Sequence, residues 1–522
     1  MAIIDFFDRG WRINPTGAAY IQDDRRYSFD EVGELSCRIA NGLLALGLPR
    51  ETKGAVWAAN DVMAWTCTLG LWRANMCWIP VGARNPAEEN HHVLDAFDCE
   101  VLFFQREFAP VVAELRPRLP KIRLWICIDA ELPGFAGAQS LMQWVRDQPA
   151  TAPGVAVDLD DVVVVSATGG TTGRPKGVMN THRSLQTMCA HLMIGCPYGA
   201  DERPVNLAAA PMTHTAGLLT LPCTARGGTA VVVTKPDPVV LLGAIPKYRV
   251  TELFLPPTVI YRLLDIPGLG RKVDFSSMRY FLYGAAPMSV EKLKQAIEAI
   301  GPVMMGGYGQ TEAPGTISCL PPDAHFANGK LASDERLSSV GHPNPLVRVE
   351  IMNDANEILP RGETGEICVR GDLVMKGYYK DPEKTAETII DGWLHTGDVG
   401  HVDSHGYLHI TDRKKDMIIT GGFNVYPSEV EQVIWGHPAV QDCAVIGVPS
   451  EQWGEEVKAV VELNAGQRVT ADELMTLCKE KLGSVKAPKS VDFVEALPRS
   501  PIGKVLKKEL RARYWQDAAR KI

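Results

Sequence analysis

The sequence predicts a soluble α/β protein with more than one domain, and three observations lead to this conclusion. The chain has 522 residues, far more than the roughly 150 residues of an average domain. Apolar residues account for 46%, charged residues for 22%, and the formal net charge is −8. This balance is typical of folded proteins and excludes disorder or nucleic acid as the main partner. Short β-branched runs alternate with helical patterns, as in sheets joined by crossover helices.

Four segments illustrate this alternation. Strands are expected over 162–165, 230–233 and 348–351, where β-branched residues are concentrated. A helix is expected over 289–300, because Ser289 can serve as its N-cap and its apolar residues share one face. The chain therefore contains the parts of a sheet with covering helices.

The last 110 residues form a separate unit in this interpretation. They contain 17 Lys and Arg against 15 Asp and Glu, whereas the rest of the chain is acidic. Two patterns, Ser428 with Glu431 and Thr470 with Glu473, predict capping boxes at helix starts. A strand is expected over 443–448. A second domain, of α+β type, fits this length.

We expect neither a targeting segment nor an integral membrane segment. Asp5 and Asp8 stand where a secretory signal has a basic flank and an apolar run. The apolar stretch 207–223 is interrupted by Pro, Thr and His residues, so it is too short to span a bilayer. The twelve cysteines include no Cys-x-x-Cys pair, which favours buried, reduced thiols over disulfides or a zinc site. The expected location is cytoplasmic.

The most specific local signal directly follows the first expected strand. It is a run of small, hydroxyl-bearing and basic residues, Thr168-Gly169-Gly170-Thr171-Thr172-Gly173-Arg174-Pro175-Lys176-Gly177. Small residues let a ligand approach the backbone, and hydroxyls, amides and Lys176 can surround phosphate oxygens. The run is not a Walker A motif, because Gly173 is followed by Arg174 and Pro175. Taken alone, it is also compatible with a glycine-rich surface turn.

This run resembles the phosphate-binding signature of the adenylate-forming superfamily, which includes acyl-CoA synthetases, peptide-synthetase adenylation domains and beetle luciferases. Gly169 is a departure, because members commonly have Ser there. Further motifs resemble those of the superfamily and follow in the same order, so that the resemblance covers nearly the whole chain. They are 283–287 (Tyr-Gly-Ala-Ala-Pro), 307–312 (Gly-Tyr-Gly-Gln-Thr-Glu), 365–378, 393–398 (Trp-Leu-His-Thr-Gly-Asp), 412–416 (Asp-Arg-Lys-Lys-Asp), 421–424 (Gly-Gly-Phe-Asn), 426–430 (Tyr-Pro-Ser-Glu-Val) and 498–504 (Pro-Arg-Ser-Pro-Ile-Gly-Lys).

The resemblance implies a fold and a division into domains. Residues 1–411 would form a large AMP-binding domain of two helix-flanked β-sheets plus a small distorted β-barrel. Residues 412–416 would be a hinge, with Lys415 at the hinge position. Residues 417–522 would be a smaller, mobile α+β domain that rotates between two reaction steps.

The resemblance also implies a nucleotide site. Tyr308 would stack on adenine, Asp398 would accept the ribose hydroxyl protons, and Arg413 would contact ribose or phosphate. Glu312 and Thr168 would hold Mg²⁺, since a carboxylate beside phosphates is tolerable only if it binds a cation. The implied ATP- and AMP-binding residues are Thr168, Gly169, Gly170, Thr171, Thr172, Gly173, Lys176, Gly284, Ala285, Ala286, Pro287, Gly307, Tyr308, Gly309, Gln310, Thr311, Asp398, Arg413 and Asn424.

Catalytic, acyl and CoA roles are implied for other residues. Lys504 would stabilise the negative charge that develops when a carboxylate attacks the α-phosphate. His214 matches a gating aromatic or His in acyl- and aryl-CoA ligases, and Glu312 completes the catalytic set. Met304 and Met305 are flexible enough to adapt to a chain or a ring. The acyl pocket would contain Met212, His214, Thr215, Tyr283, Gly306 and Gly307, and CoA would meet Gly421, Gly422 and Trp453.

The function implied is that of an acyl-CoA synthetase. A carboxylate and Mg·ATP would give acyl-AMP and pyrophosphate, and the CoA thiol would then displace AMP. The acid would be a medium- or long-chain fatty acid or an aromatic carboxylate. Two alternatives stay open, an acyl-AMP ligase that loads a carrier protein and a catalytically inactive nucleotide-binding protein. The sequence leaves open whether the protein is a monomer or a homodimer.

Overall fold

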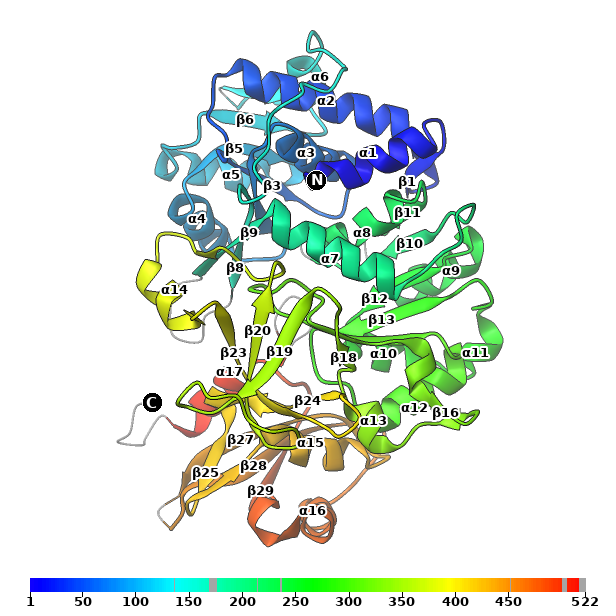
Figure 1. The fold of residues 1–522 in the computed structure, drawn as a ribbon, viewed down its shortest axis with the longest axis vertical. Helices are drawn as coiled ribbons and strands as arrows, with labels where there is room; N and C mark the ends of the chain where they lie inside the picture. Colours follow the sequence, from blue (N-terminus) through cyan, green and yellow to red (C-terminus); the bar gives the residue numbers. More distant parts are fainter. Residues whose placement is uncertain are drawn as a thin grey trace.

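The computed structural model describes residues 1–135, 137–168, 176–213, 215–234, 237–450, 452–499 and 505–515. The two large sheets with their helices lie beside one another in the upper part of the molecule as drawn, and the C-terminal elements follow below them along the long axis (Figure 1). This arrangement confirms the predicted α/β fold class.

One sheet has eight strands within the described residues, and most of its pairs are parallel. α4 (Ala87–Ala96) and α5 (Ala109–Leu115) pack on one of its faces. The glycine-rich run connects β8 to β9 along the chain. The order is β21 (Gly377–Tyr378), β9 (Lys176–Thr181), β8 (Val162–Thr168), β4 (Cys77–Gly82), β3 (Lys53–Ala58), β5 (Cys99–Phe104), β6 (Leu124–Cys127) and β7 (Ala138–Ser140).

A second sheet has nine strands in the described part of the chain. Its outer face is covered by α9 (Pro238–Tyr248), α10 (Pro257–Leu264), α11 (Leu269–Lys272) and α12 (Val290–Ile300). The order is β18 (His342–Pro343), β15 (Ser318–Leu320), β14 (Met304–Tyr308), β13 (Tyr280–Gly284), β12 (Glu252–Leu255), β10 (Val205–Ala208), β11 (Thr229–Val232), β1 (Ala18–Gln22) and β2 (Arg25–Ser28).

A common core lies between these two sheets and joins them into one body. It contains Val56 and Trp78 from the eight-stranded sheet and Tyr20 and Ala230 from the nine-stranded sheet, all of them buried. The helices that fill the space are amphipathic or wholly apolar, so they bury side chains in this common core. They are α1 (Ile4–Ile13), α2 (Phe29–Ala45), α3 (Val62–Arg73), α7 (His182–Gly195) and α8 (Thr215–Thr224).

Where the resemblance predicts a small distorted barrel, the structure has a five-stranded antiparallel sheet. Its order is β19 (Val347–Met352), β20 (Gly365–Gly371), β23 (Trp393–Val402) and β22 (Ile389–Ile390), and β24 (Leu408–Arg413) pairs with β23. The short helix α13 (Asp334–Ser338) precedes it in sequence, and α14 (Pro382–Thr388) lies between β20 and β22. β23 and β24 matter for the site, because Asp398 and Arg413 are partners in their register.

The C-terminal residues form an α+β unit with its own core, as predicted. The core contains buried residues of α15 (Pro427–Trp435), α16 (Ala471–Lys486) and the adjoining strands. α17 (Lys507–Tyr514) packs through Leu510 against the other face of the sheet. The strand order is β26 (Phe423–Val425), β25 (Ile418–Thr420), β28 (Gly454–Leu463) and β27 (Val440–Ser450), and β29 (Ser490–Val494) pairs with β28.

The predicted local elements are confirmed with one exception. The expected strands lie in β8, β11, β19 and β27, and Ser289 caps α12 by accepting the backbone N–H of Lys292. Thr470 and Glu473 form the expected capping box of α16. These signals are local in sequence, which is why they are reliable.

The capping box predicted for Ser428 and Glu431 is wrong. The N-cap of α15 is Tyr426, which makes no side-chain capping bond. The backbone N–H of Ser428 donates to the Asp412 carboxylate (2.9 Å), and buried Glu431 accepts the Val445 N–H (2.7 Å). Glu431 cannot cap the helix, because tertiary contacts have already engaged its carboxylate.

The twelve cysteines are free, and all are buried except the half-buried Cys319. This agrees with the expectation of reduced, buried thiols. Among the residues described, none of the helices is both long enough and apolar enough to cross a membrane.

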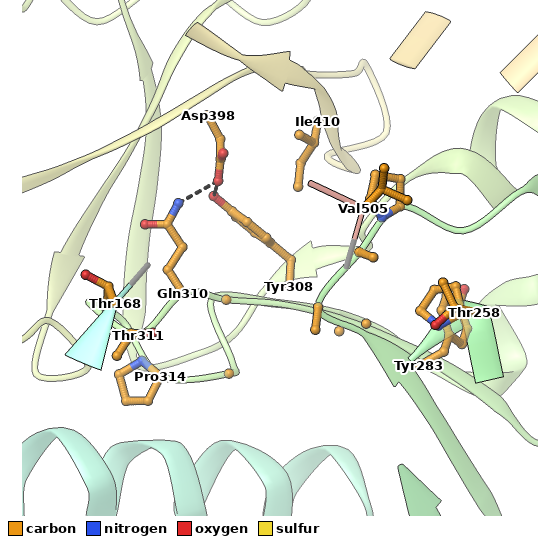
Figure 2. A pocket seen from close by; sticks show the side chains of 18 of the residues that line it. Thr168, Thr258, Tyr283, Tyr308, Gln310, Thr311, Pro314, Asp398, Ile410 and Val505 are labelled. Atoms are coloured by element: carbon orange, nitrogen blue, oxygen red, sulfur yellow. Dashed lines mark hydrogen bonds between the residues drawn. The ribbon is translucent and has the colours of Figure 1, made fainter. Parts of the chain in front are cut away.

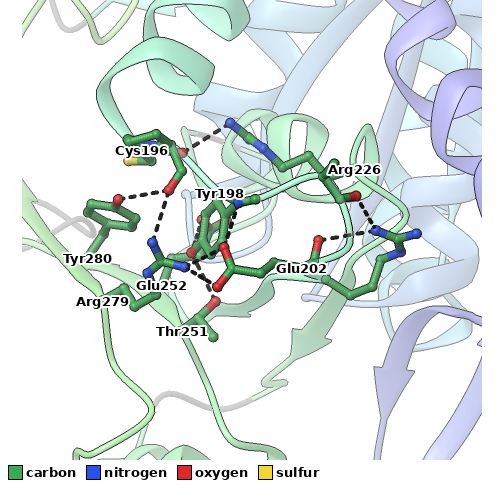
Figure 3. Close-up of polar contacts among 12 residues, drawn as sticks. Cys196, Tyr198, Glu202, Arg226, Thr251, Glu252, Arg279 and Tyr280 are labelled. Carbon is green, nitrogen blue, oxygen red and sulfur yellow. Dashed lines mark hydrogen bonds and ion pairs between the residues drawn. The ribbon is translucent and has the colours of Figure 1, made fainter.

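A cluster of polar side chains lies at the N-terminal ends of β12 and β13 (Figure 3). Tyr198 Oη donates to Glu252 Oε2 (3.1 Å), and Asn206 Nδ2 donates to Glu252 Oε1 (3.2 Å). Glu252 is only 6% exposed, and its burial raises the pKa of the carboxyl above the usual value. Burial therefore favours the neutral form of Glu252 in the folded protein.

Replacing Glu252 with Gln is expected to change stability in a pH-dependent way. The folded protein holds the proton more tightly than the unfolded chain, whose carboxyl has a pKa near 4.5, so the wild type loses stability as pH rises above that value. The Gln variant lacks this loss. Relative to the wild type, the free energy of unfolding of Glu252→Gln in urea should therefore increase as the pH is raised from about 5 to about 8.

Glu202→Gln is the matched control for this prediction. Glu202 is exposed in the same cluster, and the Gly199 N–H and Arg279 lower its pKa. The free energy of unfolding of Glu202→Gln relative to the wild type should change with pH in the opposite direction, if at all, because the folded protein stabilises the charged form of Glu202. A pH-independent difference for Glu252→Gln would contradict a neutral buried carboxyl.

Candidate active site

A cavity of about 2190 Å³ opens at the carboxyl ends of β8, β13 and β14. Open α/β sheets commonly bind ligands at this edge. Residues from distant parts of the chain meet here (Figure 2). The predicted site residues that line the cavity are Thr168, Lys176, Tyr283, Gly284, Ala285, Ala286, Pro287, Gly306, Gly307, Tyr308, Gly309, Gln310, Thr311, Glu312, Asp398, Arg413 and Lys415.

Two parallel strands build the wall on the predicted adenine side. Gly284 at the end of β13 is in register with Gly307 of β14. A Cβ on Gly284 would lie 2.5 Å from the Gly307 carbonyl oxygen, so no larger residue fits. Ala285 follows with φ +65°, and this turn carries the chain through 285–287 along the cavity. The wall therefore presents small side chains and backbone to a ligand.

Asp398 is the centre of a hydrogen-bond network in this cavity. Tyr308 Oη donates to Asp398 Oδ2 (2.7 Å), and Gln310 Nε2 donates to the same oxygen (2.6 Å), as Figure 2 shows. Arg413 Nε lies 3.1 Å from the other oxygen. The Asp398 side chain is 6% exposed, so its carboxylate is held in place before any ligand binds.

Burial and the nearby Asp398 raise the pKa of Tyr308 well above its usual value. The phenol therefore stays protonated and serves as a donor. A carboxylate oriented in this way can accept two hydroxyl protons of a diol, which is what a ribose offers. Sequence reasoning predicted Tyr308, Asp398 and Arg413, but not the bond from Gln310 that braces them.

The predicted phosphate side gathers at the ends of β8 and β9. Thr168 Oγ1 donates to the Lys176 carbonyl (3.5 Å), and the Lys176 ammonium lies 5.0 Å from the centre of the Tyr378 ring. Tyr378 Oη donates to Glu312 Oε1 (3.0 Å). Tyr378 was absent from the predicted site, although its motif, Gly377-Tyr378, indicates it. The remaining loop residues, Gly169, Gly170, Thr171, Thr172 and Gly173, lie outside the described residues.

The predicted acyl residues are only partly brought together. Tyr283 and Gly306 line the cavity, but Tyr283 Oη donates to His325 Nε2 (3.0 Å), which belongs to a residue that does not line it. Met212 is buried in the common core and does not line the cavity. Thr215 is the first residue of α8, and His214 lies outside the described residues.

Other residues line the predicted acyl side of the cavity. α7 contributes Met188, His191 and Leu192, which follow helical spacing along one face, and β14 contributes Met305. Met304 is buried on the opposite face of the sheet. Helical periodicity could have identified the α7 residues from the sequence. Met305 and Met304 differ only in the face of β14 on which each side chain lies, because side chains alternate along a strand.

His191 is a neutral residue of this wall. Its Nε2 accepts the Leu346 N–H (3.2 Å), so the proton resides on Nδ1 and faces the Thr316 carbonyl (3.1 Å). Burial lowers the pKa of His191, which keeps the ring uncharged. Met188, His191, Leu192 and Met305 therefore form an uncharged wall of the cavity.

The residues predicted to meet CoA lie apart from the cavity. Gly421 and Gly422 form the turn between β25 and β26, both with positive φ. A Cβ on Gly421 would lie 2.7 Å from the Trp453 ring, and Trp453 is 44% exposed. Together with exposed Asn424, they form an outer surface that does not line the cavity. Lys504 lies outside the described residues, but its neighbour Val505 lines the cavity (Figure 2).

An ion pair from the C-terminal unit also lines the cavity and was not predicted. Lys507 Nζ lies 2.8 Å from Glu431 Oε1, and both residues border the cavity. Glu431 and Asp412 raise the pKa of Lys507, which stays charged although buried. No local signal distinguishes Lys507 from the other basic residues near the C-terminus.

Comparisons with known proteins agree with this geometry. The family model described as AMP-binding enzyme matches residues 7–379, and the model described as AMP-binding enzyme C-terminal domain matches residues 429–504. Feruloyl-CoA synthase from Amycolatopsis sp is 37% identical over 507 residues, which cover 96% of this chain and 97% of the relative. The fatty acid–acyl-carrier-protein ligase ScoC from Streptomyces coeruleorubidus is 34% identical, covering 97% and 95%.

A solved structure extends the likeness to the fold. The amide bond synthetase McbA from Marinactinospora thermotolerans superposes with a TM-score of 0.87 and 30% identity, covering 98% of this chain and 100% of that one. The motifs, the fold and the length of the match all indicate the same family. The chain belongs to the AMP-binding enzyme family of the adenylate-forming superfamily.

Proposed function

We propose that this protein is an ATP-dependent acyl-CoA synthetase that works in two steps. A carboxylate attacks the α-phosphate of ATP and releases pyrophosphate, leaving acyl-AMP. The CoA thiol then attacks the acyl carbon and AMP leaves. The observation that carries the proposal is the pre-formed Tyr308–Gln310–Asp398 network, which lies in one cavity with an uncharged acyl wall.

The first step needs no nucleophile from the protein, because the phosphoanhydride is already activated. Catalysis then depends on position and charge. Asp398 would hold the ribose, the wall at 285–287 would hold the adenine, and Lys176 would lie against the phosphates. Lys504 would stabilise the charge that develops at the α-phosphate. None of the buried cysteines is required.

The residues present fit the Mg²⁺ that accompanies ATP in such a reaction. No cluster of three or more His, Cys, Asp or Glu that could hold a metal by itself occurs among the described residues. Mg²⁺ is usually held by substrate phosphates and one or two protein oxygens, and the Glu312 carboxylate and Thr168 hydroxyl are oxygen donors at the phosphate side. When bound, the ion would neutralise phosphate charge.

The second step requires a different arrangement of the C-terminal unit. Gly421, Gly422 and Trp453 lie outside the cavity in this structure, so CoA cannot contact them and the acyl group together. We therefore infer that residues 417–522 rotate about the segment 412–416, with Lys415 at the hinge, relative to residues 1–411. The uncharged acyl wall supports a fatty or aromatic acid as substrate.

A second candidate is an acyl-AMP ligase that transfers its product to a carrier protein. The similarity to ScoC, whose name records such a transfer, supports this candidate. The two candidates share the first step and differ only in the thiol that accepts the acyl group.

A pyrophosphate-release assay across short, medium, long and aromatic acids, with and without CoA, tests both candidates. The proposal expects pyrophosphate release with a fatty or aromatic acid and conversion of CoA to its thioester. Accumulated acyl-AMP with CoA unused would favour the carrier-protein ligase. No release with any acid would refute both.

A further inference from the structure

The side-chain amide of Gln432 joins the C-terminal unit to the large body of the protein. Gln432 lies on α15, and its Nε2 donates to the Met288 carbonyl (3.1 Å). Its Oε1 accepts the N–H of Val290 (3.5 Å), the first residue of α12. One amide therefore makes two hydrogen bonds across the boundary, both to backbone.

One of the two partners of Gln432, the Val290 N–H, is a group for which α12 has no acceptor of its own. The first N–H groups of a helix have no acceptor inside it. The Ser289 N–H donates to Tyr261 Oη (2.8 Å), and the Ser289 hydroxyl accepts the Lys292 N–H (3.4 Å). The Val290 N–H lies between these two, and Gln432 supplies its acceptor from the other unit.

The contact adjoins the nucleotide wall. Met288 directly follows the turn at 285–287, and Gln432, Met288 and that turn line the same cavity. A second bond, from Gln441 Nε2 to Asp265 Oδ2 (3.1 Å), ties the same two bodies nearby. In this arrangement Val505, next to Lys504 in the chain, also lines the cavity, whereas the hairpin at Gly421 does not.

We propose that Gln432 is a positioning residue for acyl-AMP formation, whose amide holds the C-terminal unit in the arrangement in which Val505, the chain neighbour of Lys504, lines the cavity. The bonds must break when the unit rotates for thioester formation. Gln432 thus acts through Lys504 and touches no reacting atom. This inference rests on the two-step function proposed above.

The test compares the two half-reactions in Gln432→Met. Met has a similar length and shape but can make neither hydrogen bond. Acyl-AMP formation, measured as pyrophosphate release in single turnovers, should fall about tenfold, as expected for two lost hydrogen bonds. Thioester formation from supplied acyl-AMP and CoA should stay unchanged or rise. Gln467→Met, at an exposed position of the 464–467 turn, is the matched control and should alter neither.

A second variant changes α12, on the other side of the contact, and leaves α15 unaltered. Val290→Pro removes the N–H at the first helical position, where Pro is well tolerated, and Ser289 already has the extended conformation (ψ 129°) that a following Pro requires. It should lower acyl-AMP formation less than Gln432→Met, and the double variant should be no worse than Gln432→Met alone.

Several outcomes would overturn the inference. Equal loss of both half-reactions in Gln432→Met, no loss in either, or strict additivity with Val290→Pro would each exclude a positioning role. These results differ from a failure of the proposed function, in which the wild-type protein itself would activate no acid or form no thioester.

Discussion

Replacing Lys504 with Ala is expected to abolish acyl-AMP formation and to spare thioester formation from supplied acyl-AMP. In the first step negative charge develops as the carboxylate attacks the α-phosphate, and a positioned ammonium lowers that barrier. Loss of one such group typically costs on the order of 10²–10³-fold in rate. In the second step the phosphoanhydride is already broken, so the lysine has no charge to stabilise. The structure supports this assignment, because Val505 lines the cavity that contains Asp398.

The measurement is ATP–pyrophosphate exchange for the first step and thioester formation from purified acyl-AMP for the second. Lys479→Ala, an exposed lysine of α16, is the control for loss of a positive charge in the same unit. Equal losses in both steps for Lys504→Ala would refute the division of labour between them.

Replacing Asp398 with Ala should impair both half-reactions, in contrast to the Lys504 variant. AMP remains bound through both steps, so its ribose needs the same carboxylate in each. Hydrogen bonds to a charged group are worth about 1.5–3 kcal/mol each, and two ribose hydroxyls therefore predict a rise of ~10²-fold or more in KM for ATP. The variant also removes the acceptor of the Tyr308 hydroxyl and the carboxylate partner of Arg413, whereas Gln310 keeps its bond to the Thr396 carbonyl.

Steady-state kinetics with ATP, and thioester formation from acyl-AMP, check this prediction. Tyr308→Phe is a graded comparison, because it removes one donor and keeps the carboxylate, so its loss should be much smaller. An unchanged KM for ATP in Asp398→Ala would mean that the network is structural only. A thermal unfolding scan separates lost binding from lost folding.

Most of the described residues predicted for a nucleotide site line one cavity, and they occur in short runs with demanding local geometry. Gly284 must lack a Cβ to pass the Gly307 carbonyl, and Ala285 must take a positive φ. Such requirements restrict residue type strongly, so the motifs identify the wall. Asp398 and Arg413 belong to two separate motifs, and the register of β23 and β24 brings them together.

The residues predicted for the acyl pocket are only partly brought together in the cavity, because ordinary apolar side chains give few sequence signals. Met188 and His191 are unremarkable residues of an apolar helix face, and only the packing of α7 over β14 turns them into a cavity wall. Tyr283 belongs to a motif, yet a bond to His325, 42 residues away, turns its hydroxyl from the cavity. Contacts between residues so far apart in the chain produce no recognisable sequence pattern.

By itself, the sequence determined the family and the two-part α/β architecture, and it indicated most of the residues that the fold brings into one cavity, because these depend on local steric rules and on motif order. Tertiary structure alone decided that Glu431 pairs with Lys507 instead of capping a helix, and that Gln432 reaches Val290. The reason is physical: a side chain's partner is set by how distant elements pack, and a helix or strand pattern records only which face is buried.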